Sequence, residues 1–231
     1  MGSWNILNVK YNFNEKWSGF VEGQVRKYFN IISFLRLYIM LSPSPLLLSL
    51  LFYDNFHYHE VKGGINFRPY KNFQITLAAG DYDTYREGGN FVTPKNNDEF
   101  RIWPQVLFTE NVGRFKVEHR YRAELRFTSI GYRSRFRYRI GLTYPFGKDK
   151  KYQVGANNEL FFTDKEPYFE RNRSLVFLGY KMTKVTSFQL GFLHQFDYKI
   201  NDETGRSFVQ AGVYFEFSKA KRVPSESLLS D

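Results

Sequence analysis

Hydrophobic and polar residues alternate along this chain with a period of two, and the clearest stretch is 114–127. One of its faces is fully charged, and the opposite face is almost wholly apolar. The charged face consists of Arg114, Lys116, Glu118, Arg120, Arg122, Glu124 and Arg126. Because successive side chains of a strand point to opposite sides of a sheet, this pattern predicts a strand with one polar and one apolar face. Residues 134–144 repeat it, with Arg135, Arg137 and Arg139 on the polar face.

The same alternation predicts eleven strands in all. They cover residues 4–13, 17–26, 56–68, 73–82, 99–108, 114–127, 134–144, 152–163, 169–180, 187–198 and 207–217. Strand would then take up roughly half of the chain, well above the 20–25% of an ordinary globular domain. No stretch of similar length has the 3.6-residue period of an amphipathic helix. We therefore expect one all-β domain over residues 1–217, followed by a polar tail over 218–231.

The length of these stretches favours a membrane. Globular strands usually run about 5–6 residues, whereas a strand that crosses a bilayer at a tilt near 45° needs about 9–11. Aromatic residues also stand at strand ends, as Tyr11, Phe13 and Trp17 do around the first turn. Such belts mark the two interfaces of a transmembrane barrel, whose outside is apolar and whose lumen is polar. The pattern predicts a transmembrane antiparallel up-and-down β-barrel.

Composition removes several classes of protein. The 231 residues carry a formal charge of +10, no cysteine, 25 Phe, 17 Tyr and 3 Trp. The lack of cysteine excludes disulfide scaffolds, thiolate metal sites and thiol nucleophiles, and the aromatic content excludes a disordered basic tail. A mean hydropathy of −0.48 argues against a helical membrane protein. A soluble, basic nucleic-acid-binding protein stays open as an alternative.

Several short motifs together resemble a known family. They are residues 97–103 (NDEFRIW), 118–124 (EHRYRAE), 135–139 (RFRYR), 158–161 (NELF), 172–173 (NR) and 178–180 (LGY). The combination resembles an outer-membrane β-barrel family of Bacteroidota-type bacteria, a domain of unknown function, over most of residues 4–217. The resemblance implies location and architecture, and it implies no activity and no catalytic residues.

The strand count follows from the loops. Five links between predicted strands are short, and those at 83–98 and 199–206 are longer, which is the contrast between periplasmic turns and extracellular loops. Such barrels usually have an even number of strands, so one strand is missing from the eleven that the alternation predicts. We expect twelve strands, with ten as the alternative. The apolar segment 28–52 is either an insertion or contains the extra strand, at Tyr28 to Leu41. Alternatively, the extra strand is a segment upstream of Met1.

The predicted lumen is rich in cations. The lumen-lining charged residues are predicted to be Arg114, Lys116, Glu118, Arg120, Arg122, Glu124, Arg126, Arg135, Arg137, Arg139 and Glu159. They support two readings. Salt bridges fill a narrow lumen and plug the barrel, since an unpaired charge in a confined site is costly; or rings of arginine favour the passage of small anions.

Candidate chemistry outside the lumen is sparse. All four histidines, His57, His59, His119 and His194, are predicted to face outward, where a His–Ser pair could modify lipid, but no serine has a recognisable nucleophile setting. The motif from His57 to Glu60 lacks a third metal ligand. Residues 81–98, with several acids, could hold a cation or a glycan, or form a solvated loop.

These observations predict a porin-like protein of a Gram-negative outer membrane. We expect outer-membrane lipid to surround it and favour the monomer as its oligomeric state. We expect no enzymatic activity, no catalytic residues, no metal, no cofactor and no nucleic-acid partner, with small anions as the candidate ligand. The open alternatives are a lipid-modifying enzyme and the soluble nucleic-acid-binding protein.

Overall fold

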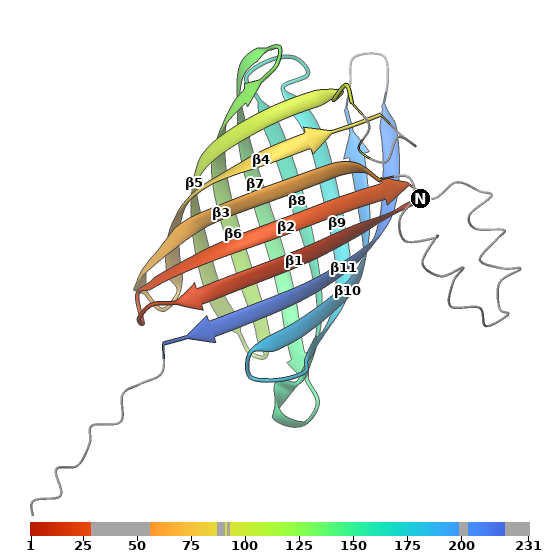
Figure 1. Cartoon of the computed structure of the whole chain (residues 1–231). Helices are drawn as coiled ribbons and strands as arrows, with labels where there is room; N and C mark the ends of the chain where they lie inside the picture. The colour runs from red at the N-terminus through yellow and green to blue at the C-terminus, as the bar shows by residue number, and fades with distance from the viewer. Residues whose placement is uncertain (29–55, 87–90, 92, 199–202, 220–231) are drawn as a thin grey trace, which may run out of the picture.

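The computed structural model is a closed β-barrel, and it describes residues 1–28, 56–86, 91, 93–198 and 203–219. Neighbouring strands follow one another around the wall in chain order, as Figure 1 shows. The all-β, up-and-down barrel predicted from the alternation is confirmed. No helix among these residues is long and apolar enough to cross a membrane.

Each of the eleven predicted strands is present in the described residues, and each extends close to its predicted bounds. The strands are β1 Gly2–Asn12, β2 Trp17–Tyr28, β3 Phe56–Tyr70, β4 Phe73–Thr84, β5 Asn97–Val112, β6 Phe115–Thr128, β7 Gly131–Phe146, β8 Tyr152–Thr163, β9 Phe169–Lys181, β10 Thr186–Asp197 and β11 Thr204–Ser218. A short 3₁₀ turn, η1 Lys148–Lys150, lies between β7 and β8.

The barrel closes through a parallel pair. β1 runs alongside β11 from Gly2 opposite Phe208 to Asn12 opposite Ser218, whereas the ten other neighbouring pairs of the described sheet are antiparallel. Eleven lies between the expected twelve and the alternative ten, and the expectation of an even number does not hold for the described sheet. An odd number makes the first and last strands point the same way, so no extra strand is needed to reconcile their directions. The predicted strand at 28–41 and the rest of segment 28–52 lie, from residue 29 on, outside the described residues.

The two faces of the wall are inverted relative to a soluble protein. On β6, Tyr121 and Leu125 are 38% and 40% exposed on the outside, whereas Arg122 is 8% exposed inside. On β7, Phe136 is exposed while Arg137 is buried. Apolar side chains therefore cover the exterior and charged ones face the axis, as the alternation predicted. Such an exterior suits hydrocarbon and would promote aggregation in water.

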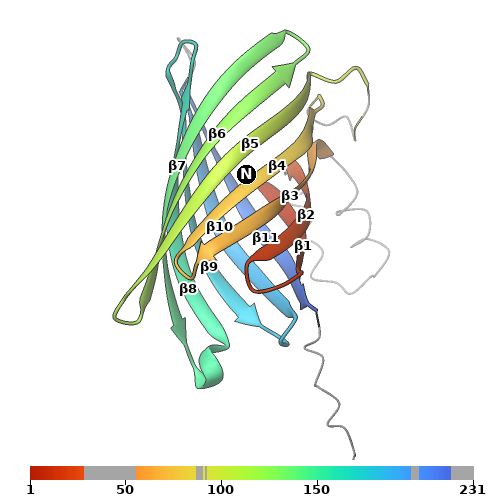
Figure 2. The same ribbon diagram turned by 90° about the vertical axis from the view of Figure 1, so that its left-hand side faces the viewer.

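Connections between consecutive strands alternate between the two ends of the barrel, which Figure 2 shows from the side. One end, here called the turn end, carries the links 13–16, 71–72, 113–114, 147–151 and 182–185. The opposite, loop end includes the connection 85–96. All five links predicted to be short therefore lie at one end.

Aromatic residues pair at both ends of the outer wall. At the turn end the ring centroids of Trp17 and Phe67 lie 4.6 Å apart. At the loop end Phe169 packs 4.6 Å from Tyr198 and 5.3 Å from Phe162. These two belts match the interfacial girdles expected where a barrel wall meets lipid headgroups.

One prediction concerns the close approach of β3 and β4. A Cβ on Gly64 would lie 2.4 Å from the Cβ of Ala78 and 2.6 Å from the carbonyl oxygen of Leu77, whereas nothing lies within 4 Å of a Cβ on Gly23. We expect Gly64→Ala to lower the free energy of unfolding by about 1–3 kcal/mol because backbone must shift. Urea unfolding in lipid vesicles measures this change.

The matched control is Gly23→Ala, for which we expect a change within about 0.5 kcal/mol. Both substitutions restrict the unfolded chain alike, so their difference isolates the steric clash. Equal effects of the two variants would contradict the packing argument.

Candidate functional site

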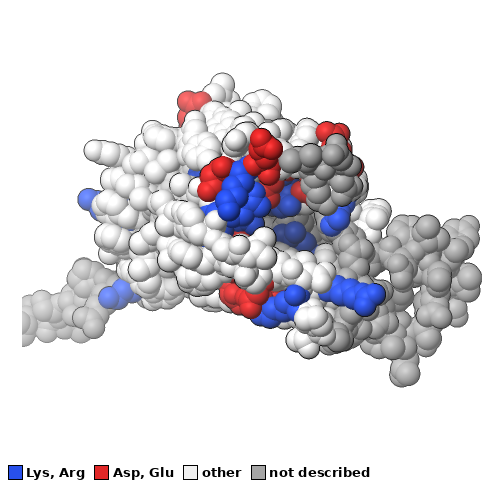
Figure 3. All heavy atoms as spheres, turned by 90° about the horizontal axis from the view of Figure 1, so that it is seen from above, with Lys and Arg blue, Asp and Glu red and all other residues white. Residues whose placement is uncertain are grey.

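The lumen of the barrel contains a cavity of about 720 Å³ that side chains from every strand line. Seen from above in Figure 3, lysine, arginine and acidic side chains gather around a hollow in the middle of the barrel, and the wall around it is mostly uncharged. The polar faces of the strands thus meet in one place because the sheet is closed. This hollow is the candidate site.

Cations outnumber acids around the cavity. Among the described residues, thirteen lining side chains are cationic: Arg26, Lys62, Arg101, Lys116, Arg120, Arg122, Arg126, Arg135, Arg137, Arg139, Arg171, Arg173 and Arg206. Seven lining side chains are acidic: Glu22, Glu60, Glu99, Glu118, Glu159, Glu170 and Asp197. Glu124, which is fully buried behind the arginines, is the eighth acid. These thirteen cations and eight acids around the cavity therefore leave a surplus of five positive charges.

Glu124 is the central acceptor of the arginines on β6 and β7. Arg137 Nη1 donates to its Oε1 at 2.5 Å, Arg122 Nη1 donates to the same oxygen at 3.3 Å, and Arg135 Nη1 donates to Oε2 at 3.4 Å. Arg122 and Arg137 stand directly opposite each other in the register of the two strands. Like charges in that position repel, so a carboxylate between them is required to hold the sheet together.

Glu159 on β8 is the second shared carboxylate. Arg137 donates to its Oε1 through Nε at 3.0 Å, Arg120 donates to the same oxygen, and Arg173 Nη1 approaches Oε2 at 3.9 Å. Arg137 therefore links Glu124 to Glu159. Because each carboxylate serves several guanidinium groups, the lattice of salt bridges leaves the surplus of positive charge uncompensated.

The structure brings ten of the eleven predicted lumen residues together. Nine of them line the cavity: Lys116, Glu118, Arg120, Arg122, Arg126, Arg135, Arg137, Arg139 and Glu159. Glu124 lies directly behind this lining. Arg114 differs, because it is exposed in the turn before β6, where its Nη1 donates to the Tyr144 hydroxyl at 3.1 Å. The alternating pattern continues one residue beyond the start of β6, so it wrongly predicted Arg114 in the lumen. Arg114 lies instead at the turn end.

Aromatic side chains inside the lumen are the feature that the sequence analysis missed. The Arg26 guanidinium lies 3.4 Å from the centroid of Trp4, and Arg173 lies 4.6 Å from the same ring. Phe161, which is 1% exposed, packs 4.5 Å from Arg137. The sequence contained the information to predict this, because Phe161 is two residues from Glu159 and therefore lies on the same face of the strand. Cation–π contacts favour a guanidinium over such rings.

Three of the four histidines lie on the outer wall, as predicted, and His57 does not. His57 is buried and lines the cavity, at the point where the pairing of β2 and β3 shifts register between Arg26 and Lys27. Such a register shift changes which face a side chain occupies.

His194 and Ser207 form an exposed pair on the outer wall. Nδ1 of His194 lies 3.0 Å from Oγ of Ser207, directly across β10 and β11. A hydrolase needs more than a nucleophile and a base: a group that orients the base and donors for an oxyanion. Among the described residues, no hydrogen bond from a third side chain to His194 is present.

Comparisons with family profiles, curated proteins and solved structures show what this chain is similar to. A family profile described as "Protein of unknown function (DUF2490)" matches residues 1–206. No curated protein matches. Among solved structures, the anion-selective porin from Comamonas acidovorans matches with a TM-score of 0.37 and 10% identity, over 85% of this chain and 55% of that one. The chain thus spans about half the length of that porin, and at this TM-score the likeness supports no inference about function.

The shared carboxylates lead to a prediction about stability. Glu124→Gln keeps the shape of the side chain but leaves Arg122, Arg135 and Arg137 without their common counter-charge. We expect the free energy of unfolding to fall by about 3–5 kcal/mol, the range found when one partner of a buried ion pair is removed. Urea titration followed by tryptophan fluorescence measures it.

The control is Glu110→Gln near the turn end of β5, where the side chain is exposed. This variant should change stability by less than about 0.5 kcal/mol. A Glu124→Gln protein as stable as the control would mean that the arginines find other acceptors.

A further prediction addresses lipid hydrolysis. Since the His194–Ser207 pair has no orienting group among the described residues, we expect wild type and Ser207→Ala to release fatty acid from phospholipid vesicles at the same background rate. Thin-layer chromatography of the vesicle lipids checks this. Turnover that Ser207→Ala abolishes would establish an enzyme.

Proposed function

We propose a function from the lumen alone, because this chain belongs to the DUF2490 family, whose description names no function. The protein is a bacterial outer-membrane barrel that admits small anions into a cationic lumen. The observation that carries this proposal is the surplus of five positive charges around a cavity of about 720 Å³. Rings of arginine lower the barrier for anions and raise it for cations.

The exterior supports the membrane location. Exposed apolar side chains such as Leu77, Val176 and Leu190 lie on strands around the barrel, between the two aromatic belts. Burial of this surface in hydrocarbon avoids the aggregation expected in water. The closed sheet needs no partner to cover an edge, which is consistent with a monomer surrounded by lipid.

The position of the arginines argues against the alternative of nucleic-acid binding. Arg122 and Arg137 are 8% exposed and engaged with carboxylates inside the barrel. A DNA duplex, whose major groove alone is about 12 Å wide, cannot reach them through a closed wall. Small anions can reach the lining from the end of the barrel, where the charges are visible in Figure 3.

Two cations are well placed to select anions because their salt bridges to the lattice are few and long. The guanidinium of Arg139 approaches only Glu118, at 3.8 Å, among the salt bridges of the described residues. Arg173 donates to the neutral Gln195 at 2.8 Å and reaches Glu159 only at 3.9 Å. By contrast, Arg137 donates to both Glu124 and Glu159, so a substitution there would also disturb the lattice.

A plugged structural barrel is the second candidate, and the complete burial of some lumen side chains favours it. Trp103 and Phe161 are 1% exposed and Glu124 is 0% exposed. Side chains so enclosed leave no passage at their own positions. The anion channel and the plugged barrel would use the same lumen residues. They differ only in whether the cavity is continuous from one end of the barrel to the other.

Conductance decides between them. In planar lipid bilayers with a KCl gradient, we expect wild type to conduct with a reversal potential that shows anion preference. Arg139→Gln and Arg173→Gln should each reduce the ratio of anion to cation permeability by a factor of about five, as expected for about 1 kcal/mol lost from one unit charge at contact distance.

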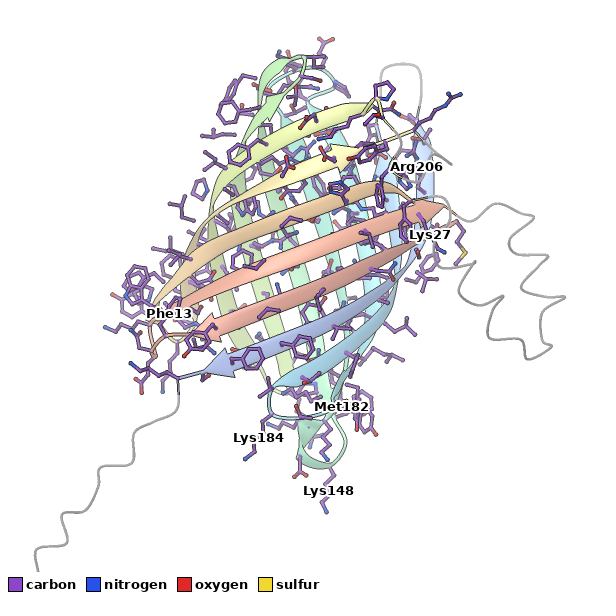
Figure 4. All side chains as sticks on the ribbon, in the orientation of Figure 1. Phe13, Lys27, Lys148, Met182, Lys184 and Arg206 are labelled. Atoms are coloured by element: carbon purple, nitrogen blue, oxygen red, sulfur yellow. The ribbon has the colours of Figure 1, made fainter. Side chains whose placement is uncertain are left out.

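The matched control is Lys184→Gln, which removes one positive charge at the turn end, where Figure 4 shows Lys184 pointing away from the barrel. It should leave the reversal potential unchanged. A folded but silent wild type would favour the plugged barrel, and cation preference would refute the proposal.

A further inference from the structure

Three carboxylates converge on the outer face of the barrel, close to its loop end. One oxygen from each of Asp81, Asp83 and Asp98 lies within 4.8 Å of the other two. On β4, Tyr82 and Thr84 line the lumen, so Asp81 and Asp83 face outward. On β5, Asn97 and Glu99 line the lumen, so Asp98 also faces outward. The wall therefore separates this cluster from the lumen, so a role of the cluster does not depend on the anion proposal.

The arrangement is electrostatically unfavourable by itself. Asp83 stands directly opposite Asp98 in the register of β4 and β5, and Asp81 is two residues from Asp83 on the same face. Like charges directly opposite each other destabilise a sheet. Carboxylates held this close require positive charge between them.

Asp83 adds a second observation, because one of its oxygens has no partner. Its side chain is only 4% exposed, and Oδ1 is buried without a hydrogen bond. The rings of His59, Tyr85 and Phe91 pack against one another beside it, with centroids 5.3–5.5 Å apart. Oδ2 has three neighbours: Nζ of Lys95 at 2.8 Å, the Tyr85 hydroxyl at 3.4 Å and Nε2 of His59 at 3.4 Å. A buried anionic oxygen without a partner carries a desolvation cost that a bound cation would offset.

Lys95 neutralises only part of the cluster. Its Nζ lies 2.8 Å from Oδ2 of Asp83 and 3.2 Å from Oδ2 of Asp98. One ammonium group offsets one of three negative charges. It also occupies Oδ2 and leaves Oδ1 of Asp83 open.

We propose that Asp81, Asp83 and Asp98 form a Ca²⁺-binding site on the lipid-facing wall beside the loop end. Ca²⁺ binds carboxylate oxygens at about 2.3–2.6 Å in irregular geometry, so oxygens on opposite sides of the ion lie up to about 5 Å apart. Mg²⁺ requires about 2.0–2.1 Å and strict octahedral geometry, which a site on two strands fits less well. Water completes the coordination on the exposed side, where Asp81 and Asp98 lie.

The affinity is expected to be low. Three protein carboxylates are fewer than the six to eight oxygens that Ca²⁺ prefers, and Lys95 competes for two of them. A dissociation constant of about 10⁻⁴ to 10⁻³ M, the range of extracellular calcium modules, is therefore expected.

Luminescence of Tb³⁺, a Ca²⁺ substitute, tests the site in the full-length protein in uncharged detergent micelles. Tyr85 lies beside Asp83 and should transfer excitation energy to the bound ion. Wild type should give a saturable emission that Ca²⁺ reverses at a concentration at least several-fold lower than Mg²⁺ does. Tyr85→Phe should lose most of the emission, and calorimetry measures the Ca²⁺ affinity of this variant separately.

Substitutions separate a calcium site from a lysine-neutralised cluster. Asp83→Asn should weaken Ca²⁺ binding at least tenfold, and Lys95→Gln should strengthen it several-fold because a competing cation is removed. Asp98→Asn, at an exposed position, serves as the second variant in case Asp83→Asn fails to fold. The control is Asp149→Asn in the exposed turn at the other end of the barrel, which should bind Ca²⁺ as wild type does.

Several outcomes would overturn the assignment. They are the absence of saturable emission in wild type, equal affinity for Ca²⁺ and Mg²⁺, and binding by Asp98→Asn that equals binding by Asp149→Asn. Weaker Ca²⁺ binding in Lys95→Gln would also contradict it. None of these results bears on conductance, so the two proposals fail separately.

Discussion

Closure of the sheet through β1 and β11 is the constraint on which the other features of this protein depend. A strand edge in hydrocarbon would leave backbone N–H and C=O groups unpaired, each at a cost of several kcal/mol. The parallel register from Gly2 opposite Phe208 to Asn12 opposite Ser218 removes that edge along all of β1. Closure also separates two environments, because one face of every strand then points to a confined axis and the other to the surroundings. This separation explains why charged and apolar residues alternate along each strand.

Charges in the confined lumen have a structural role and carry the proposed function. Glu124 and Glu159 hold opposed arginines of neighbouring strands, and Arg137 connects the two carboxylates. Without these contacts, the in-register pair of Arg122 and Arg137 would destabilise the sheet. The number of acids is nevertheless smaller than the number of cations, so the same lattice that rigidifies the wall leaves a net positive field along the axis. Stability and the proposed anion preference therefore depend on one set of side chains.

The outer wall is not uniformly apolar, and its polar positions lie near the loop end. His194 meets Ser207 three residues from the end of β10, and Asp83 meets Asp98 near the adjoining ends of β4 and β5. Polar side chains are tolerated there because lipid headgroups and water replace hydrocarbon near the aromatic belt. In the middle of the wall, residues such as Leu77 and Val176 face outward. In the proposed membrane setting, depth thus decides which outward residues can be polar.

The sequence by itself determined the strands, their two faces and the charged lining, because a period of two along 114–127 leaves a helix no consistent face. It misplaced Arg114 and His57, since a strand end and a register shift are not visible in a local pattern. Only the tertiary structure decided that the described sheet closes with an odd number of strands, that Glu124 rather than Glu118 is the central acceptor, and that Asp81, Asp83 and Asp98 converge. These features join residues far apart in the chain, and their distances follow from closure and register, which no stretch of sequence specifies alone.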